Sequence, residues 1–238
     1  MITLAIDTSD MRGSVAILKE GAVPATETPD CPSEFSAWLL PAVRAALSKA
    51  QVKMEQLDLL AVCTGPGSFT GLRVGLTTMK AWAEVYNKPI VGVSRLEAIA
   101  RSCELDSGLL AACYDAQRGQ IFAGLYRQCS GSLQRLGKEL VIGPEDFVHM
   151  VDDQFGEKCV SWVSLNPELM ADLKEMKVRV AAGDRIIPAP SQLAPIIGKM
   201  AEQMAAAGQL SDPISLDANY VRRSDAEIFW KGSPGIAR

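Results

Sequence analysis

The sequence predicts an α/β fold made of two lobes that share a topology. Residues 57–93 have the pattern of a strand, a glycine-rich loop, a helix and a second strand, which is the order of a parallel crossover unit. A pair of strands whose first member ends at Asp7 recurs with its first member ending at Asp115, 108 residues further along a chain of 238. This repeat predicts an N-terminal lobe, residues 1–104, and a C-terminal lobe, residues 105–238.

The first half contains the elements of one such lobe. Two apolar runs, 2–6 and 14–18, flank turn residues, which predicts a strand, a polar turn and a returning strand. Apolar residues at helical spacing predict a helix over 33–50, with Ser33 as its N-cap and Pro41 either kinking it or dividing it in two. A buried strand is predicted over 57–63, a helix over 70–86 and a short strand over 89–93.

The second half repeats this plan with more elements. Its patterns predict strands over 109–114, 120–126, 133–142 and 158–163, and helices over 144–151, 167–176 and 190–207. One further strand is predicted over 178–182. The segment 212–238 is polar, with aromatic residues and prolines, and its end is expected to be mobile.

Composition excludes several classes of protein. The chain has 24 Lys and Arg against 28 Asp and Glu, a net charge of −4, and 48% hydrophobic residues, which excludes disordered and fibrous proteins. Proteins that bind nucleic acid alone do so with clustered Lys and Arg residues, and the mild acidic excess of this chain argues against that. A role on nucleic acid would therefore need a partner. No apolar run approaches the roughly 18 residues of a membrane span, and the start lacks the basic flank of a signal peptide. We therefore expect a cytoplasmic protein without membrane contact.

Histidine and cysteine usage argues against the common catalytic and metal sites. The single histidine, His149, lies in a helical stretch without a second ligand at metal spacing, so we interpret it as structural and expect no metal. The six cysteines have no pair closer than ten residues, so no CxxC site exists. Their even count leaves a disulfide open, although a chain of this size does not need one.

Acidic turns follow the first strand of each predicted pair. In Asp7-Thr8-Ser9, and again at Asp115, amides and hydroxyls can face a phosphate while the carboxylate holds a hydrated metal ion. Two such turns, one in each lobe, would suit a nucleotide bound between the lobes. The alternative is an aspartate that caps the backbone of its own turn.

The run Gly65-Pro66-Gly67-Ser68-Phe69-Thr70-Gly71 is the most specific motif in the chain. Its glycines allow close backbone approach, and it opens a helix whose free amides favour an anion. It lacks the Gly-Lys-Ser/Thr of a Walker loop and the flanking glycines of a nucleophile elbow, which disfavours a nucleophilic Ser68. An anion pocket, or a rigid helix start that shapes an interface, remains open.

The helix after this loop is apolar on two faces. One stripe contains Leu72, Leu76, Met79, Ala83 and Tyr86, and the other contains Val74, Thr78, Ala81 and Val85. One stripe can cover a sheet, and the second then needs another partner. Burial within a single large domain is the alternative. We favour a subunit interface, with the following residues expected there: Leu72, Arg73, Gly75, Leu76, Met79, Ala83 and Tyr86.

Five segments together resemble one protein family. They are Ala5-Ile6-Asp7-Thr8-Ser9, the loop from Gly65 through Arg73 to Gly75, Val93-Ser94-Arg95-Leu96-Glu97-Ala98, Tyr114-Asp115-Ala116 with Arg118, and Asn219-Tyr220-Val221-Arg222. They resemble the bacterial TsaB family, also called YeaZ, and the resemblance extends from Met1 to about Glu227. It implies a two-lobed, duplicated fold of the actin, heat-shock-protein-70 and sugar-kinase (ASKHA) type.

The resemblance also implies a function. TsaB proteins are non-catalytic scaffold or activating subunits for threonylcarbamoyl transfer to the adenosine beside the tRNA anticodon. The paralogue TsaD carries the chemistry and the metal-binding histidines, and the ATPase TsaE joins the complex. Family members are also labelled glycoprotease-like, a name inherited from the paralogue. In the family, the helix after the glycine loop packs on a second copy of itself or on the paralogue, which implies a homodimer when the protein is alone and only indirect contact with tRNA.

The resemblance carries no catalytic residue and no metal site over to this chain, because residues 31–41 contain none of the paralogue's metal histidines. No cofactor is implied, although ATP or ADP in the cleft or at a subunit interface stays open. The alternative function is a nucleotide-binding phosphotransferase or ATPase of the same fold, and a peptidase is disfavoured. The residues considered for a nucleotide or anion are Asp7, Thr8, Ser9, Gly65, Gly67, Ser68, Asp115 and Arg118.

Overall fold

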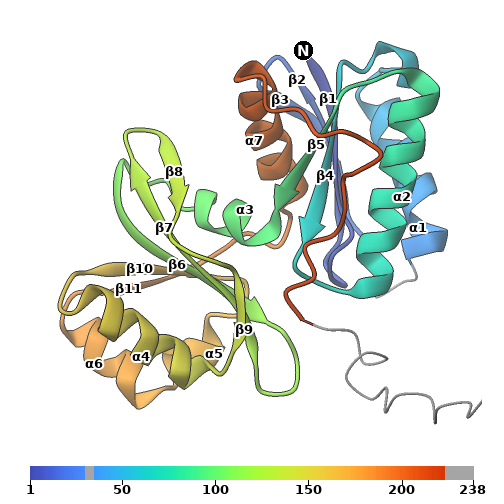
Figure 1. Ribbon diagram of the computed structural model, residues 1–238. Helices are drawn as coiled ribbons and strands as arrows, with labels where there is room; N and C mark the ends of the chain where they lie inside the picture. The colour runs from blue at the N-terminus through green and yellow to red at the C-terminus, as the bar shows by residue number, and fades with distance from the viewer. Residues whose placement is uncertain (30–34, 223–238) are drawn as a thin grey trace, which may run out of the picture.

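Two mixed β-sheets organise the computed structural model, which describes residues 1–29 and 35–222 (Figure 1). The first sheet has the strand order β3-β2-β1-β4-β5. β1 pairs antiparallel with β2 and parallel with β4, and β5 extends the parallel part. Its strands are β1 (Ile2–Asp7), β2 (Ser14–Lys19), β3 (Ala22–Glu27), β4 (Leu59–Gly65) and β5 (Ile90–Ser94).

The second sheet repeats this topology with the order β11-β10-β6-β7-β8. β6 takes the place of β1, since it pairs antiparallel with β7 and parallel with β10. Asp7 and Asp115 therefore end equivalent strands, and the prediction of two lobes with related topology is confirmed. The strands are β6 (Ser107–Asp115), β7 (Ile121–Cys129), β8 (Ser132–Arg135), β10 (Val160–Ser164) and β11 (Arg185–Pro188), with β9 (Leu140–Ile142) paired to β7.

Helices cover both faces of each sheet, and the layers are visible in Figure 1. α1 (Phe35–Lys49) and α2 (Phe69–Tyr86) lie on the outer face of the first sheet, and α3 (Arg95–Arg101) and α7 (Ala194–Ala206) lie between the two sheets. α4 (Pro144–Phe155), α5 (Glu168–Ala171) and α6 (Lys174–Ala181) cover the outer face of the second sheet. A short 3-10 helix, η1 (Met54–Gln56), precedes β4.

Alternation along β1 shows how the core is divided. Leu4 and Ile6 face the cluster beneath α1 and α2, whereas Ala5 faces the cluster that contains α7. Gly198 lets α7 approach closely, because a Cβ there would lie 2.3 Å from Leu18 Cδ1. A helix from the second half of the chain thus completes the first lobe, and the predicted division at residues 104 and 105 stays a prediction.

Several predicted elements are corrected by the structure. Residues 35–49 form one helix, so the alternative of two short helices is wrong; Pro41, the seventh residue of this helix, is exposed, so the carbonyl group that loses its donor can be solvated. The predicted cap Ser33 lies outside the described residues. The predicted strand 133–142 is two strands, the helix 167–176 is α5 and the start of α6, and the predicted strand 178–182 is wrong because residues 174–181 are helical. The elements β3, α3 and β11 were not predicted.

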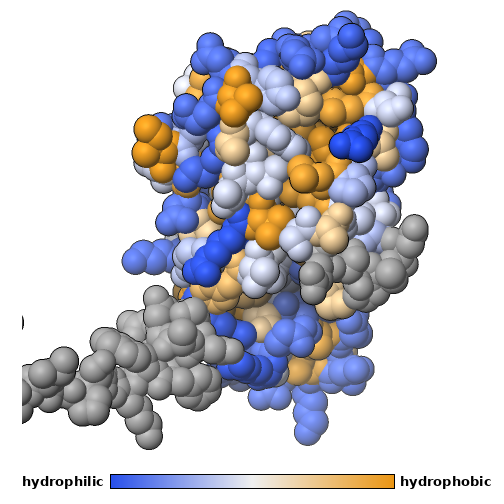
Figure 2. Space-filling view, turned by 90° about the vertical axis from the view of Figure 1, so that its right-hand side faces the viewer, coloured by the Kyte–Doolittle hydropathy of each residue, from blue (hydrophilic) through white to orange (hydrophobic). Residues whose placement is uncertain are grey.

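The outer face of the first lobe carries hydrophobic side chains. Figure 2 looks onto the side of the molecule where α1 and α2 lie, and hydrophobic residues are gathered there among polar ones. These two helices carry two exposed large hydrophobic side chains, Leu40 on α1, at 54%, and Val85 on α2, at 75%. None of the helices within the described part of the chain combines the length and hydrophobicity needed to cross a bilayer.

Candidate functional site: the cavity between the lobes

The turn after β1 is buried and internally bonded. Asp7 has no exposed surface, and its Oδ1 accepts a 2.9 Å hydrogen bond from the Ser9 amide and another from the Ser9 hydroxyl. The alternative of an aspartate that caps its own turn is therefore what the structure shows. Asp115 does the same in the second lobe, where it accepts hydrogen bonds from the Gln117 amide at 2.7 Å and from Gln117 Nε2 at 2.8 Å.

The glycine loop packs its backbone directly onto this turn. The Ser68 amide donates to the Ser9 carbonyl oxygen at 2.7 Å. A Cβ on Gly67 would lie 2.4 Å from that same oxygen, so only glycine allows the contact. The Ser68 hydroxyl caps α2 by accepting from the Gly71 amide at 3.3 Å, which gives it a structural role at the helix start.

A buried arginine, Arg95, neutralises the turn. Its side chain, at the first position of α3, is fully buried, with Nη2 2.7 Å from Asp10 Oδ2 and Nε 3.5 Å from Asp7 Oδ2. Burial alone would lower the pKa of Arg95, but Asp7 and Asp10 outweigh it and hold that pKa above its ordinary value. Burial would likewise raise the pKa of Asp10, but Arg95 and Arg12 lower it below 3.8.

Sequence reasoning missed the role of Arg95, although it noted the segment that contains it. Four apolar residues, one glutamate and one arginine follow Arg95 in α3, and nothing in this pattern indicates that the charged residue at the helix start is buried. Its carboxylate partners lie in β1 and the turn after it, far away in the sequence. Only the fold brings these charges together.

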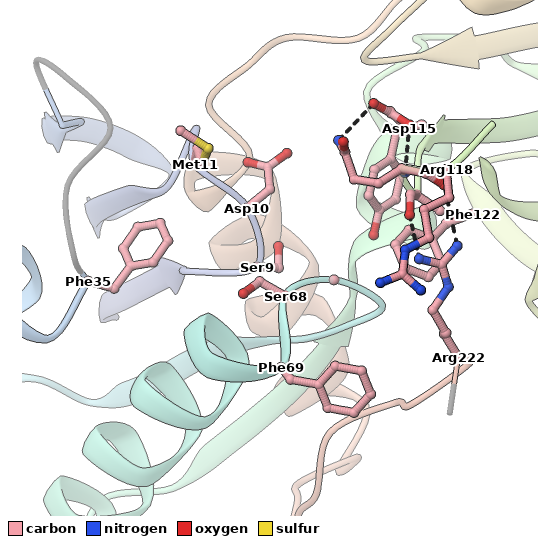
Figure 3. Close-up of a pocket in the computed structure, with 14 residues that line it drawn as sticks. Ser9, Asp10, Met11, Phe35, Ser68, Phe69, Asp115, Arg118, Phe122 and Arg222 are labelled. Atoms are coloured by element: carbon pink, nitrogen blue, oxygen red, sulfur yellow. Dashed lines mark hydrogen bonds between the residues drawn. The ribbon is translucent and has the colours of Figure 1, made fainter. Parts of the chain in front are cut away.

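A cavity of about 540 Å³ lies between the lobes, next to these groups (Figure 3). Ser9, Asp10 and Ser68 lie on its first-lobe side, and Arg118 and Arg222 lie on the opposite side with Phe122. Among the residues predicted for a nucleotide or anion, the structure brings five to this cavity: Ser9, Gly67, Ser68, Asp115 and Arg118. Three do not line it: Asp7, Thr8 and Gly65.

The end of the described chain forms a strap, residues 209–222, that joins the lobes. The Asn219 amide donates to the Thr64 carbonyl oxygen at 2.7 Å in the first lobe, while its side chain donates to the Glu139 carboxylate of the second. Tyr220 stacks on Phe69 at 4.8 Å between ring centroids. Arg222 then donates to the Ala116 carbonyl oxygen at 2.7 Å, beside the cavity.

The interface expected on α2 is corrected by burial. Leu72, Leu76, Met79 and Ala83 are at most 5% exposed and pack into the chain's own core, and Gly75 is also buried, so this stripe covers the sheet. A Cβ on Gly75 would lie 2.3 Å from Thr8 Oγ1. Among the residues expected at the interface, only Arg73 and Tyr86 reach the surface, and Arg73 donates to the Tyr220 hydroxyl at 3.1 Å.

The second stripe of α2 is the one left at the surface. Ala81 and Val85 are exposed, and Val74 and Thr78 are half-buried. On another side of the helix, the strap lies against α2, because Lys80 Nζ donates to the Leu216 carbonyl oxygen at 2.8 Å. The surface available to a partner on α2 is therefore the second stripe, and α1, which contacts α2, adds the exposed residue Leu40.

Other candidate groups are dispersed. His149 lies on the exposed side of α4, away from the cavity. Within residues 1–29 and 35–222, no three His, Cys, Asp or Glu side chains come together as metal ligands. The five cysteines in this part of the chain are free thiols, and Cys31 lies outside it.

Comparison with known proteins gives consistent matches. A family model described as TsaD, tRNA N6-adenosine threonylcarbamoyltransferase, matches residues 21–172. The chain is 30% identical to the tRNA threonylcarbamoyladenosine biosynthesis protein TsaB of Bacillus subtilis (strain 168), over 97% of this chain and 98% of that protein. It is also 30% identical to the protein of the same name from Escherichia coli (strain K12), over 99% of each.

Solved structures agree on the fold. The structure titled YeaZ from Pseudomonas aeruginosa is similar with a TM-score of 0.74 and 25% identity, over 92% of this chain and 99% of that chain. A ROK hexokinase from Thermus thermophilus is similar with a TM-score of 0.54 and 10% identity, over 86% of this chain and all of that one. The second likeness concerns the fold alone, and it confirms the expected sugar-kinase type.

Proposed function

Because the chain belongs to the TsaB (YeaZ) family, with a role in tRNA threonylcarbamoyladenosine biosynthesis, we propose that it is a non-catalytic subunit that pairs with a TsaD-type transferase. In this role it supports threonylcarbamoyl transfer to the adenosine beside the anticodon. The observation that carries the proposal is the similarity to TsaB proteins over nearly the full length of both chains.

The state of the Asp7 carboxylate supports a non-catalytic role. One of its oxygens is occupied by the Ser9 turn, and the other faces the Arg95 guanidinium. It is therefore poorly placed to orient a nucleophile or bind a metal ion. Ser68 caps a helix, and the only histidine lies on the exposed side of α4. These observations disfavour the alternative of a phosphotransferase or ATPase.

The exposed stripe of α2 supports pairing through the outer face of the first lobe. Val85 exposes 75% of its surface, and Ala81 and Val74 continue the stripe along α2, while Leu40 on α1 exposes 54%. Burying such side chains stabilises an interface by roughly 25 cal/mol for each Å² removed from water. The partner we propose for this face is the first lobe of a TsaD-type subunit.

The same face can serve a homodimer when the transferase is absent. Homodimer and heterodimer would then exclude each other, because both bury Val85. We further propose that a TsaE-type ATPase joins the pair, that the assembly acts in the cytoplasm, and that this chain touches tRNA only indirectly. Its net charge of −4 supports the last point, since tight tRNA contact needs clustered cations.

A matched pair of substitutions tests the proposed interface. Val85→Glu places a charge on the exposed stripe of α2, whereas Val178→Glu places one on α6 of the other lobe, where the valine is similarly exposed, at 69%. Analytical ultracentrifugation with a TsaD-type partner should show at least a tenfold loss of affinity for Val85→Glu and wild-type affinity for Val178→Glu. Equal affinities for the two variants would contradict pairing through this face.

A further inference from the structure

The Arg95 guanidinium lies at the base of the inter-lobe cavity, behind Asp10 and Tyr114, which line the cavity, whereas Arg95 itself does not. It has no exposed surface, and none of its three nitrogens has an aligned hydrogen-bond acceptor among the described residues. Two carboxylates and an aromatic ring surround it. Nη2 lies 2.7 Å from Asp10 Oδ2, and Nε lies 3.5 Å from Asp7 Oδ2. The centroid of the Tyr114 ring lies 4.5 Å from Cζ. A buried cation held mainly by ion pairs, with few directed hydrogen bonds, acts as a counter-ion.

The two carboxylates form the kind of oxygen donor set that a magnesium ion takes. Asp7 is the last residue of β1 and does not line the cavity, whereas Ser9 and Asp10, in the turn after β1, do. A hydrated magnesium ion does not fit there in this chain, however. Asp7 Oδ1 is occupied by the Ser9 turn, and the space beside Asp7 Oδ2 and Asp10 Oδ2 holds the guanidinium.

We propose that Arg95 is a built-in cation that replaces a divalent metal ion at the base of the cavity, so that this cavity takes no magnesium–nucleotide complex. The positive charge that would arrive with a ligand in a metal-dependent cleft is supplied by the chain itself. This inference does not depend on the role in tRNA modification.

The same side chain also links the lobes. Arg95 and its carboxylates belong to the first lobe, whereas Tyr114 belongs to β6 of the second. The Tyr114 hydroxyl donates to the Pro66 carbonyl oxygen in the glycine loop, which brings the ring under the guanidinium. At the base of the cavity the lobes are thus joined by the contacts of Tyr114 with Pro66 and with Arg95.

Replacing the arginine tests the proposal. Arg95→Ala leaves the buried Asp7 carboxylate without its ion pair, while Asp10 keeps its 2.8 Å ion pair with Arg12, and should lower Tm by about 6 to 20 °C. Magnesium chloride should restore much of the lost Tm in Arg95→Ala, whereas potassium chloride of equal ionic strength should not. Neither salt should raise the Tm of the wild type to a similar extent. The double variant Asp7→Asn, Arg95→Met removes the ion pair and should regain most of the Tm without a response to magnesium.

Binding to the wild-type chain provides a second test that does not require a stable variant. Calorimetry with ADP should show no binding that depends on magnesium. Magnesium-dependent binding of ADP that is lost in Asp7→Asn would overturn the proposal. So would an Arg95→Ala protein that responds equally to the two salts, or one that stays unfolded with magnesium present.

Discussion

The Thr8 hydroxyl donates a 2.7 Å hydrogen bond to the carbonyl oxygen of Gly71, and a Cβ on Gly71 would lie 2.0 Å from the Thr8 carbonyl oxygen. The end of β1 and the first turn of α2 are therefore in backbone contact. The glycine loop, which as a motif suggested space for an anion, here fits against a neighbouring turn. Its most specific residues hold the first lobe together.

Gly71→Ala should destabilise the protein markedly. The new methyl group has no room beside Thr8, so α2 or the β1 turn must shift, at a cost of about 1–3 kcal/mol or more. Urea unfolding followed by circular dichroism measures the loss. Thr70→Ala, at the exposed neighbouring position, should stay within about 0.5 kcal/mol of the wild type. A Gly71→Ala protein as stable as that control would mean that the contact is looser than described.

Met79→Ala tests whether Met79 is a core residue or an interface residue. Met79 is fully buried against the first sheet, so the substitution should cost about 2–5 kcal/mol in unfolding free energy. Thr77→Ala, on the exposed side of the same helix, should have little effect. If Met79→Ala instead kept full stability and weakened only subunit pairing, the original expectation of an interface residue would stand.

Tyr220→Ala should loosen the strap that joins the lobes. It removes the stacking on Phe69 and the hydrogen bond from Arg73, which together contribute roughly 1–3 kcal/mol. Hydrogen exchange in residues 209–222 should become faster. Tyr220→Phe keeps the ring and should retain most of the protection, so equal exchange in the two variants would assign the effect to the hydrogen bond alone.

Asp10 should contribute to acid sensitivity. Its folded-state pKa lies below the ordinary 3.8 because Arg95 and Arg12 outweigh burial. A lowered folded pKa gives stability that is complete above the unfolded value and is lost as pH falls through the folded value. The difference in unfolding free energy between wild type and Asp10→Asn should therefore be constant near neutral pH and shrink below pH 3.8. A difference that grew on acidification would contradict the lowered pKa.

The two-lobed topology could be predicted because two strand pairs are clear in the sequence. The first strand of one pair ends at Asp7, and the first strand of the other ends at Asp115. Sequence reasoning missed α3 because a short helix that is buried nearly all round has no polar face to reveal its period. It also predicted a strand over 178–182, a mostly apolar segment that contains two valines. The structure makes it helical, with Arg179 held by Asp184 at 2.6 Å and by Asp152.

The site was predicted less completely than the fold. Asp7 had two alternative interpretations, and its hydrogen bonds from Ser9 together with the position of Arg95 favour the capping interpretation. The stripe of α2 that faces the core could not be told from the stripe that faces outward, because both are apolar and helical spacing alone gives no direction. The strap was also missed, since Asn219 and Tyr220 contact residues far away in the sequence.

The transfer reaction itself is the most direct test of the proposed function. Threonylcarbamoyl incorporation into tRNA is measured with TsaD-type and TsaE-type proteins of the same source, with and without this chain. We expect incorporation only when the chain is present. Asp7→Asn should leave incorporation undiminished at concentrations where that variant is folded. Val85→Glu should strongly reduce incorporation, whereas Val178→Glu should not. Full incorporation without this chain would contradict its role as a required subunit.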